Sequence, residues 1–155
     1  MMTIDDIQSS IHFFFDVIKA DFLPEEREDQ LSIALDRLAL ASHFAEWTFD
    51  ETDYPDAPCR KYETMRELVS PIFPECGYYN VVLNITEQIG EGSPAVGDAI
   101  DDICDIAGDL EEVLWRWRRN SVDDALWYFN ESYRYHWGQH LRELQLYLYA
   151  KKNGW

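Results

Sequence analysis

Apolar residues recur at every third or fourth position along most of the chain, which is the spacing of amphipathic α-helices. The first such stretch follows Thr3, which forms a helix-capping pattern with Asp6, and it continues to Ile18. The second starts at Pro24, because proline is favoured in the first turn of a helix. The acidic segment 48–58 contains two prolines and is predicted to be a loop. The apolar face of the second helix consists of Leu31, Leu35, Leu38 and Ala45.

The second half of the chain carries signals for longer helices. Ser93 followed by Pro94 has the sequence of a helix N-terminus, and Ser121 with Asp124 repeats the capping pattern. The residue pattern therefore predicts three helices, over residues 60–72, 94–118 and 121–151. The segment between the first two of them is ambiguous.

In that segment, Val81, Val82 and Leu83 have strand propensity. A lone strand would have no partner elsewhere in this sequence, so we expect a short helix within residues 78–89. The resulting fold class is all-α. We expect residues 1–155 to form one domain, a helical bundle of about five main helices that are mostly antiparallel to their neighbours.

The charge balance changes the range of possible functions. The chain has 13 basic and 30 acidic residues, a net charge of −17. Residues 1–57 hold 14 acids and three bases, so the first two helices and their loop carry most of the excess. Such a chain is repelled by nucleic-acid phosphates and anionic membranes, so we expect a protein partner, and a basic one.

The cellular compartment is predicted from membrane-spanning segments, targeting signals and cysteines, of which the sequence has few or none. No apolar stretch reaches the 18 or so residues of a membrane span, and the N-terminus has no signal-peptide pattern. Cys59, Cys76 and Cys104 are an odd number at wide spacings, which fits neither a disulfide framework nor a zinc-binding cysteine pair. We therefore expect a cytoplasmic protein with free thiols.

Aspartates form a stripe on the helix predicted over residues 94–118. They span an arc of about 100° on a helical wheel, roughly opposite the apolar residues of the same helix. This position favours a solvated face, and the alternatives are a polar network with another helix or a Mg²⁺ or Mn²⁺ site. The members of the stripe are Asp98, Asp101, Asp102, Asp105 and Asp109.

Two histidines on the last predicted helix, His136 and His140, have the i, i+4 spacing of the zinc-binding H-E-x-x-H motif. Trp137 replaces the glutamate that acts as general base in that motif, so zincin chemistry is excluded. Both histidines lie at the edge of the apolar face, where we expect a hydrogen-bonded imidazole. Gly138 costs about 1 kcal/mol in a helix relative to alanine, which indicates a close contact or ligand approach there.

Aromatic residues are dense around these histidines. We interpret Trp127, Tyr133 and Trp137 as packing residues rather than a ligand cage, because large aromatic side chains supply most of the buried area in small domains. With Gly138 they are also the candidate pocket residues.

Two blocks of sequence resemble an uncharacterised bacterial family, domain of unknown function 5063, within residues 74–149. One block joins Val96-Gly97 to Asp101-Asp102-Ile103-Cys104-Asp105-Ile106 and Asp109-Leu110. The other comprises Ala125-Leu126-Trp127, Phe129, Tyr133 and His136-Trp137-Gly138-x-His140. The resemblance implies a compact helical bundle and no known activity.

The resemblance also implies that the aspartate and histidine helices are neighbours. We expect a carboxylate–imidazole layer between them, with at least one histidine bonded to an aspartate. The members of this cluster are Asp102, Asp105, Asp109, His136 and His140. A hydrogen-bonded network is favoured over a metal site.

Three functions follow from these patterns. The leading hypothesis is a non-catalytic acidic interaction protein, such as an adaptor, an inhibitor or an immunity-type module, with no cofactor. The alternative is a metal-dependent all-α hydrolase of a nucleotide or phosphoester, in which Mg²⁺ or Mn²⁺ is held by the Asp/His cluster. A homodimer that buries surplus aromatic surface is the third.

Overall fold

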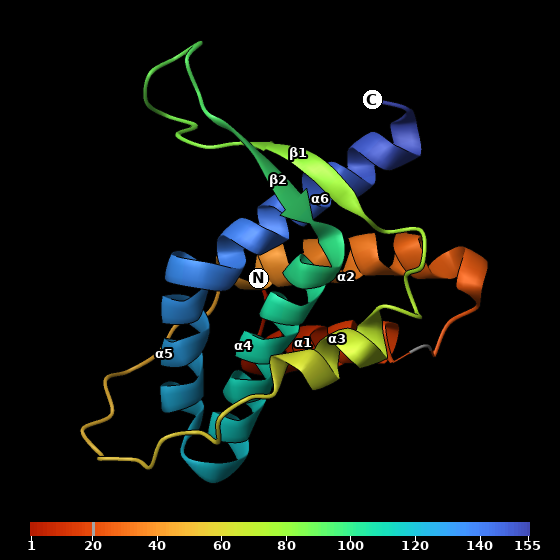
Figure 1. The fold of residues 1–155 in the computed structure, drawn as a ribbon. Coiled ribbons are helices and arrows are strands. Elements are labelled where there is room, and N and C mark those ends of the chain that lie inside the picture. The colour runs from red at the N-terminus through yellow and green to blue at the C-terminus, as the bar shows by residue number, and fades with distance from the viewer. Residues whose placement is uncertain (20) are drawn as a thin grey trace.

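The computed structural model describes residues 1–19 and 21–155, and it is mainly helical (Figure 1). A small two-stranded antiparallel sheet accompanies the helices. In chain order the elements are α1 (Ile4–Ile18), the 3₁₀ turn η1 (Pro24–Glu26), α2 (Arg27–Ala41), α3 (Tyr62–Val69), β1 (Tyr78–Val82), β2 (Pro94–Asp98), α4 (Ala99–Arg119), α5 (Val122–Ser132), the π-helical segment η2 (Tyr133–Trp137) and α6 (Gly138–Asn153).

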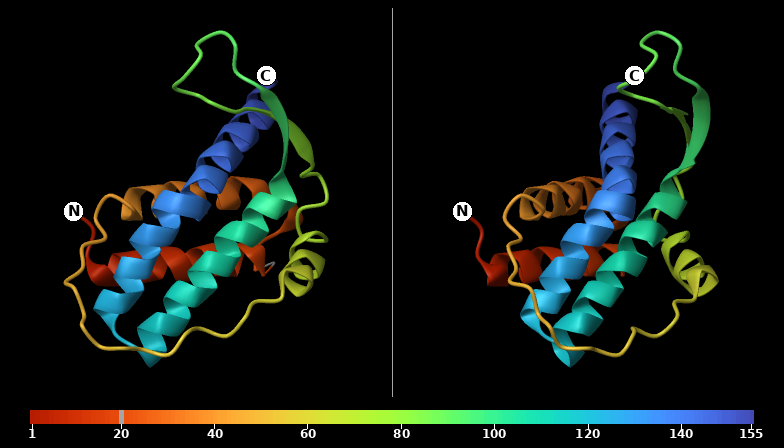
Figure 2. Two further views of the ribbon diagram at one scale, coloured as in Figure 1. Left: turned by 60° about the vertical axis from the view of Figure 1, so that its left-hand side comes forward. Right: turned by 90° about the vertical axis from the view of Figure 1, so that its left-hand side faces the viewer.

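The helices form two antiparallel pairs that cross. One pair is α1 and α2, and the other is α4 with the continuous run of α5, η2 and α6 (Figure 2). We call this run the C-terminal helical run. The core lies between the two pairs, and α3 covers the outer side of α4. The predicted helical bundle is therefore confirmed in its main helices. None of the described helices combines the length and the apolar character that crossing a membrane requires.

Two of the three predicted helix-capping patterns, at Thr3 and Ser121, are confirmed. The Thr3 hydroxyl accepts a hydrogen bond from the Asp6 backbone N–H, and the Asp6 carboxylate accepts one from the Thr3 backbone N–H. The Ser121 hydroxyl likewise accepts from the Asp124 backbone N–H and starts α5. Each cap satisfies N–H groups that the first helical turn leaves without a partner.

The prediction of a short helix within residues 78–89 is wrong. Residues 78–82 form β1, which pairs with β2 from Tyr78 opposite Asp98 to Val82 opposite Pro94. The predicted start of the next helix at Pro94 is wrong for the same reason, because residues 94–98 are the partner strand. Helix α4 begins at Ala99, where the Asp98 carboxylate caps the backbone N–H groups of the first turn.

Two other boundaries differ from the prediction. Helix α3 is shorter than the predicted 60–72 segment. The helix predicted over residues 121–151 is interrupted by η2, where the Gly138 N–H bonds the Tyr133 carbonyl five residues earlier. A Cβ atom on Gly138 would lie 2.3 Å from that carbonyl oxygen, so the close contact expected at this glycine is with the backbone of its own helical run.

Candidate functional site

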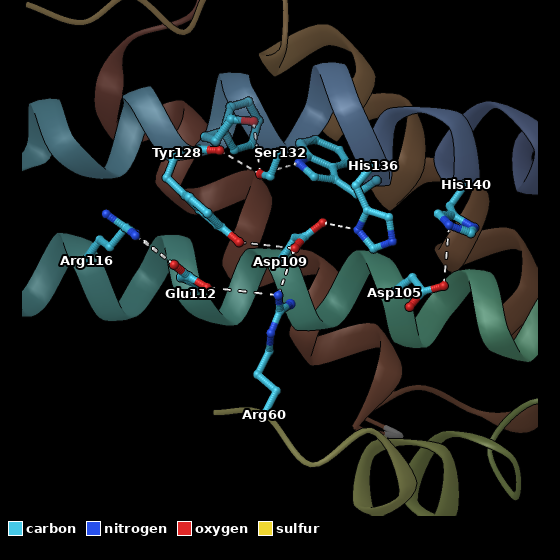
Figure 3. A network of polar contacts seen from close by, with 11 residues as sticks. Arg60, Asp105, Asp109, Glu112, Arg116, Tyr128, Ser132, His136 and His140 are labelled. Carbon is cyan, nitrogen blue, oxygen red and sulfur yellow. Dashed lines mark hydrogen bonds and ion pairs between the residues drawn. The ribbon is translucent and has the colours of Figure 1, made fainter. Parts of the chain in front are cut away.

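The aspartates of α4 and the histidines of the C-terminal helical run meet in one polar layer. Nδ1 of His136 lies 2.6 Å from Oδ2 of Asp109, and Nδ1 of His140 lies 2.8 Å from Oδ1 of Asp102. Figure 3 shows both imidazoles pointing toward α4, with Asp109 and Asp105 pointing back toward them. The expectation that a histidine bonds an aspartate across these helices is confirmed for both histidines.

The wheel-based expectation of a solvated aspartate stripe is wrong for two of its members. Asp102 and Asp109 are each 3% exposed, because the C-terminal helical run packs over this side of α4. Asp98 caps α4 and pairs with Arg66 at 2.8 Å, and the Asp101 carboxylate accepts a hydrogen bond from the Tyr62 hydroxyl. The stripe is therefore divided between capping, surface pairing and the buried layer.

Asp109 is held by three donors from three parts of the chain. Besides His136, Nη2 of Arg60 lies 3.0 Å from its Oδ1 atom, and the Tyr128 hydroxyl lies 3.3 Å from the same atom. Arg60 can lie across α4 because Gly108 has no side chain, and a Cβ atom there would be 2.5 Å from Nη1 of the arginine. Both oxygens of the buried Asp109 carboxylate therefore have hydrogen-bond partners.

Asp102 has a second partner as well. The Tyr79 hydroxyl, from β1, donates to Oδ2 of Asp102 while His140 occupies Oδ1. Burial, together with the neighbouring carboxylate, raises the pKa of Tyr79, so its hydroxyl stays protonated and remains a donor. The strand that the sequence did not predict therefore supplies one of the groups that fix the site.

Arg60, Tyr79 and Tyr128 are the site residues that sequence analysis missed. Each reaches the layer through tertiary packing, from the loop before α3, from β1 and from α5. No local sequence signal indicates Tyr79, which reaches the layer only because β1 pairs with β2 and so aligns Tyr79 with Gly97 just before α4.

Asp105 completes the layer on its open side. Its Oδ2 atom lies 3.4 Å from Nε2 of His140, and the two imidazole centroids are 5.0 Å apart. One ligand atom each from Asp105, His136 and His140 can be chosen so that all lie within 4.8 Å of one another. Ligands of a single Zn²⁺ ion lie about 3–4 Å apart, so small side-chain rotations bring these three groups onto one ion.

The predicted packing residues divide into buried and exposed ones. Trp137 is fully buried, stacks edge-on against Phe129 and Tyr133, and donates its indole N–H to the Ser132 hydroxyl at 3.0 Å. Gly138 is also buried. Trp127 is 38% exposed, so its interpretation as a core residue is wrong. It lies on the outer side of α5 beside Arg116.

A cavity of about 350 Å³ opens beside the layer. Asp105 and His136 lie in its wall on one side, and residues of α3 with Arg60 and Lys61 lie on the other. Solutes therefore have access to the side of the layer on which Asp105 lies, whereas Asp102 and Asp109 are enclosed behind the imidazoles.

The protonation of His140 should be visible in the stability of the metal-free protein. The hydrogen bond to Asp102 raises the pKa of His140 above its ordinary value of 6.5, against the effect of burial. A histidine with a raised folded-state pKa stabilises the fold below its unfolded pKa, and this contribution is lost as pH rises through the folded pKa. We expect the free energy of unfolding, measured with urea in EDTA, to fall as pH rises above 6.5 through that folded pKa.

The matched variants are His140→Gln and His43→Gln, since His43 is exposed and is not a member of the layer. The fall should become shallower in His140→Gln and persist in His43→Gln. An identical pH dependence in wild type and His140→Gln would contradict the assignment of this titration to His140.

Comparison with solved structures finds a protein with a similar fold. A crystal structure of protein BF1032 from Bacteroides fragilis superimposes with a TM-score of 0.70, covering 96% of this chain and 89% of that chain at 18% sequence identity. At this identity the similarity concerns the fold alone. A search of the curated proteins gave no match.

The family comparison extends further along the chain than the sequence blocks indicated. The model of a family described as "Domain of unknown function (DUF5063)" matches residues 29–151, which includes most of α2 and of α6, the elements between them, and every residue of the polar layer. The chain belongs to the DUF5063 family.

Proposed function

We propose that this protein binds a divalent transition-metal ion, Zn²⁺ in the first place, through Asp105, His136 and His140. The observation that carries the proposal is the orientation of the two imidazoles. Their Nδ1 atoms are each held by a separate buried carboxylate, so their Nε2 atoms remain for a ligand on the side where Asp105 lies.

Carboxylates behind histidine ligands are a regular feature of metal sites. A metal-binding histidine almost always donates its second ring N–H to a carboxylate or carbonyl, which fixes the tautomer and makes the ligating nitrogen more basic. Asp109 and Asp102 stand in this relation to His136 and His140. The proposal thus assigns ligand roles to Asp105, His136 and His140 and supporting roles to Asp102 and Asp109.

The formal charge of the layer also favours a cation. Asp102, Asp105 and Asp109 contribute −3 and Arg60 contributes +1, so with neutral imidazoles the layer carries −2. One divalent ion balances this charge, and so do protons on both imidazoles. Metal and protons therefore compete for the same site, and metal affinity should rise with pH.

The donor set selects among ions. Two imidazole nitrogens and one carboxylate suit Zn²⁺ and other transition metals better than Mg²⁺, which prefers oxygen ligands. This preference replaces the Mg²⁺ or Mn²⁺ expected from the aspartates alone, since two of those aspartates lie behind the histidines.

Three protein ligands leave at least one coordination position open, as in catalytic zinc sites. The open side faces the cavity beside Asp105 and His136. A zinc-bound water has a pKa near 7 and acts as a nucleophile at neutral pH, so the supported reaction class is hydrolysis, with a phosphoester as substrate. The proposal therefore favours the metal-dependent hydrolase over the interaction protein.

Three expectations from the sequence stay predictions. They are a non-catalytic interaction protein with a basic partner, a homodimer, and a cytoplasmic location. The net charge of −17 supports a basic partner, but an acidic surface by itself does not define a binding site. The polar layer has defined atoms and directions, and for that reason we place the function there.

Metal binding is tested by thermal unfolding of EDTA-treated protein with and without added Zn²⁺. At a free Zn²⁺ concentration about 100-fold above Kd, we expect Tm to rise by about 5–10 °C. Asp105→Asn and His140→Ala should lose this rise, and titration calorimetry should give one site per chain in the wild type. Mg²⁺ should produce a smaller shift.

His43→Ala is the control, because it removes an exposed imidazole outside the layer. Asp105→Asn separates ligand loss from misfolding, since it preserves the side-chain shape and Asp105 is only partly buried. Equal stabilisation of wild type, Asp105→Asn and His140→Ala by Zn²⁺, or no stabilisation of any of them, would contradict the proposal.

A further inference from the structure

The cavity beside the polar layer adjoins a larger cavity. The smaller one measures about 350 Å³ and the larger about 510 Å³, and both have Arg60, Lys61 and Glu111 in their walls. The larger cavity is enclosed by α1, by the segment that precedes α3, and by the C-terminal half of α4. We refer to the two adjoining cavities together as the Arg60 cleft.

The larger cavity is positively charged within an acidic protein. Four basic side chains stand against two acidic ones in its wall, so its formal charge is +2 in a chain of −17. The basic residues are Lys19, Arg60, Lys61 and Arg118, and the acidic ones are Glu111 and Glu112.

Most of these basic groups are available to a ligand. Among the residues that the structure describes, no carboxylate lies at salt-bridge distance from Lys19, Lys61 or Arg118. Arg60 bonds Asp109 through Nη2 alone, which leaves the N–H donors on Nη1 and Nε. Guanidinium and ammonium donors of this kind bind phosphate oxygens through charge-assisted hydrogen bonds.

The same cavity has an apolar side. Phe15, Leu114 and Trp115 line it together with the basic residues. A flat aromatic group packs well against such side chains, and a Trp ring is a good surface for stacking a nucleobase. The volume is of the size that proteins use for small ligands.

We propose that the Arg60 cleft binds a nucleoside monophosphate. Its phosphate lies at the junction of the two cavities, beside Arg60 and Lys61, and its base lies in the larger cavity toward Trp115. The phosphate is then next to Asp105 and His136. This inference deepens the proposed metal function and rests on it for one point, namely that the phosphate is the part of the ligand that reacts. The positive charge of the larger cavity does not depend on the metal.

Titration calorimetry with adenosine monophosphate tests the proposal on both EDTA-treated and Zn²⁺-loaded wild type. We expect binding to both forms, and tighter binding to the loaded form. Lys61→Ala should weaken binding about tenfold, the worth of one charge-assisted hydrogen bond, and Lys61→Arg should retain it. Adenosine, which lacks the phosphate, should bind at least about tenfold more weakly than the monophosphate.

Arg119→Ala is the matched control, because it removes one positive charge from the exposed end of α4 outside the cleft and should leave the affinity within about twofold. If the monophosphate binds and Lys61→Ala weakens its binding, while Zn²⁺ does not bind, the inference about the cleft is supported and the metal proposal fails. If Zn²⁺ binds through Asp105 and His140, but the monophosphate binds wild type and Lys61→Ala equally or binds neither, the cleft inference is overturned. Equal affinity for adenosine would also overturn it.

Discussion

Replacing Trp137 with alanine is expected to lower the free energy of unfolding by about 3–5 kcal/mol. The indole is fully buried, packs against Phe129 and Tyr133, and donates its N–H to Ser132. The substitution opens a large cavity between the C-terminal helical run and its neighbours, and it leaves the Ser132 hydroxyl without this donor. Urea unfolding followed by circular dichroism measures the loss.

Trp127→Ala is the control, since that indole is 38% exposed on the outer side of α5. Trp127→Ala should lower the free energy of unfolding by less than about 1 kcal/mol, in addition to what the loss of the cation–π contact with Arg116 costs. Similar costs for the two variants would mean that Trp137 does not occupy the buried position described for it, and the orientation of His136 beside it would then be in doubt.

Gly138→Ala is expected to destabilise the protein by about 1–3 kcal/mol, although glycine to alanine in a regular helix stabilises by about 1 kcal/mol. The reversed sign comes from η2. The added Cβ would lie 2.3 Å from the Tyr133 carbonyl oxygen, and a backbone atom cannot move aside as a flexible side chain can. The same urea unfolding measurement gives the sign directly.

Gln139→Ala tests the neighbouring exposed position, where alanine should be neutral within about 0.5 kcal/mol. Because η2 sets the direction in which His136 leaves the helix, Gly138→Ala should also weaken Zn²⁺ binding. A stabilised Gly138→Ala variant with unchanged Zn²⁺ affinity would show that the π-helical segment is not required by this glycine.

The sequence predicted the helices whose determinants are local. Thr3 and Ser121 cap helices through residues three positions away, so their signals lie within one turn of sequence. The strand β1 was missed because its partner lies in a segment whose Ser93-Pro94 pair resembles the start of a helix. Strand pairing is a non-local property, and neither strand is stable without the other.

The polar layer shows the same division. The family resemblance predicted that His136 and His140 lie against the aspartate helix, and both histidines do contact aspartates of α4. The helical wheel placed Asp102 and Asp109 in solvent because it compares residues only with their own helix, whereas α4 is covered on that side by the C-terminal helical run. Arg60 and Tyr79 reach the layer from distant segments, and no spacing in the sequence could have indicated them.

Anomalous diffraction at the zinc absorption edge, from crystals of the Zn²⁺-loaded protein, tests the central claim most directly. The account predicts one strong peak about 2.0–2.2 Å from Nε2 of His136, Nε2 of His140 and a carboxylate oxygen of Asp105, with Asp102 and Asp109 still bonded to the imidazoles. A peak bound to other side chains, or no peak within reach of these three residues, would contradict it.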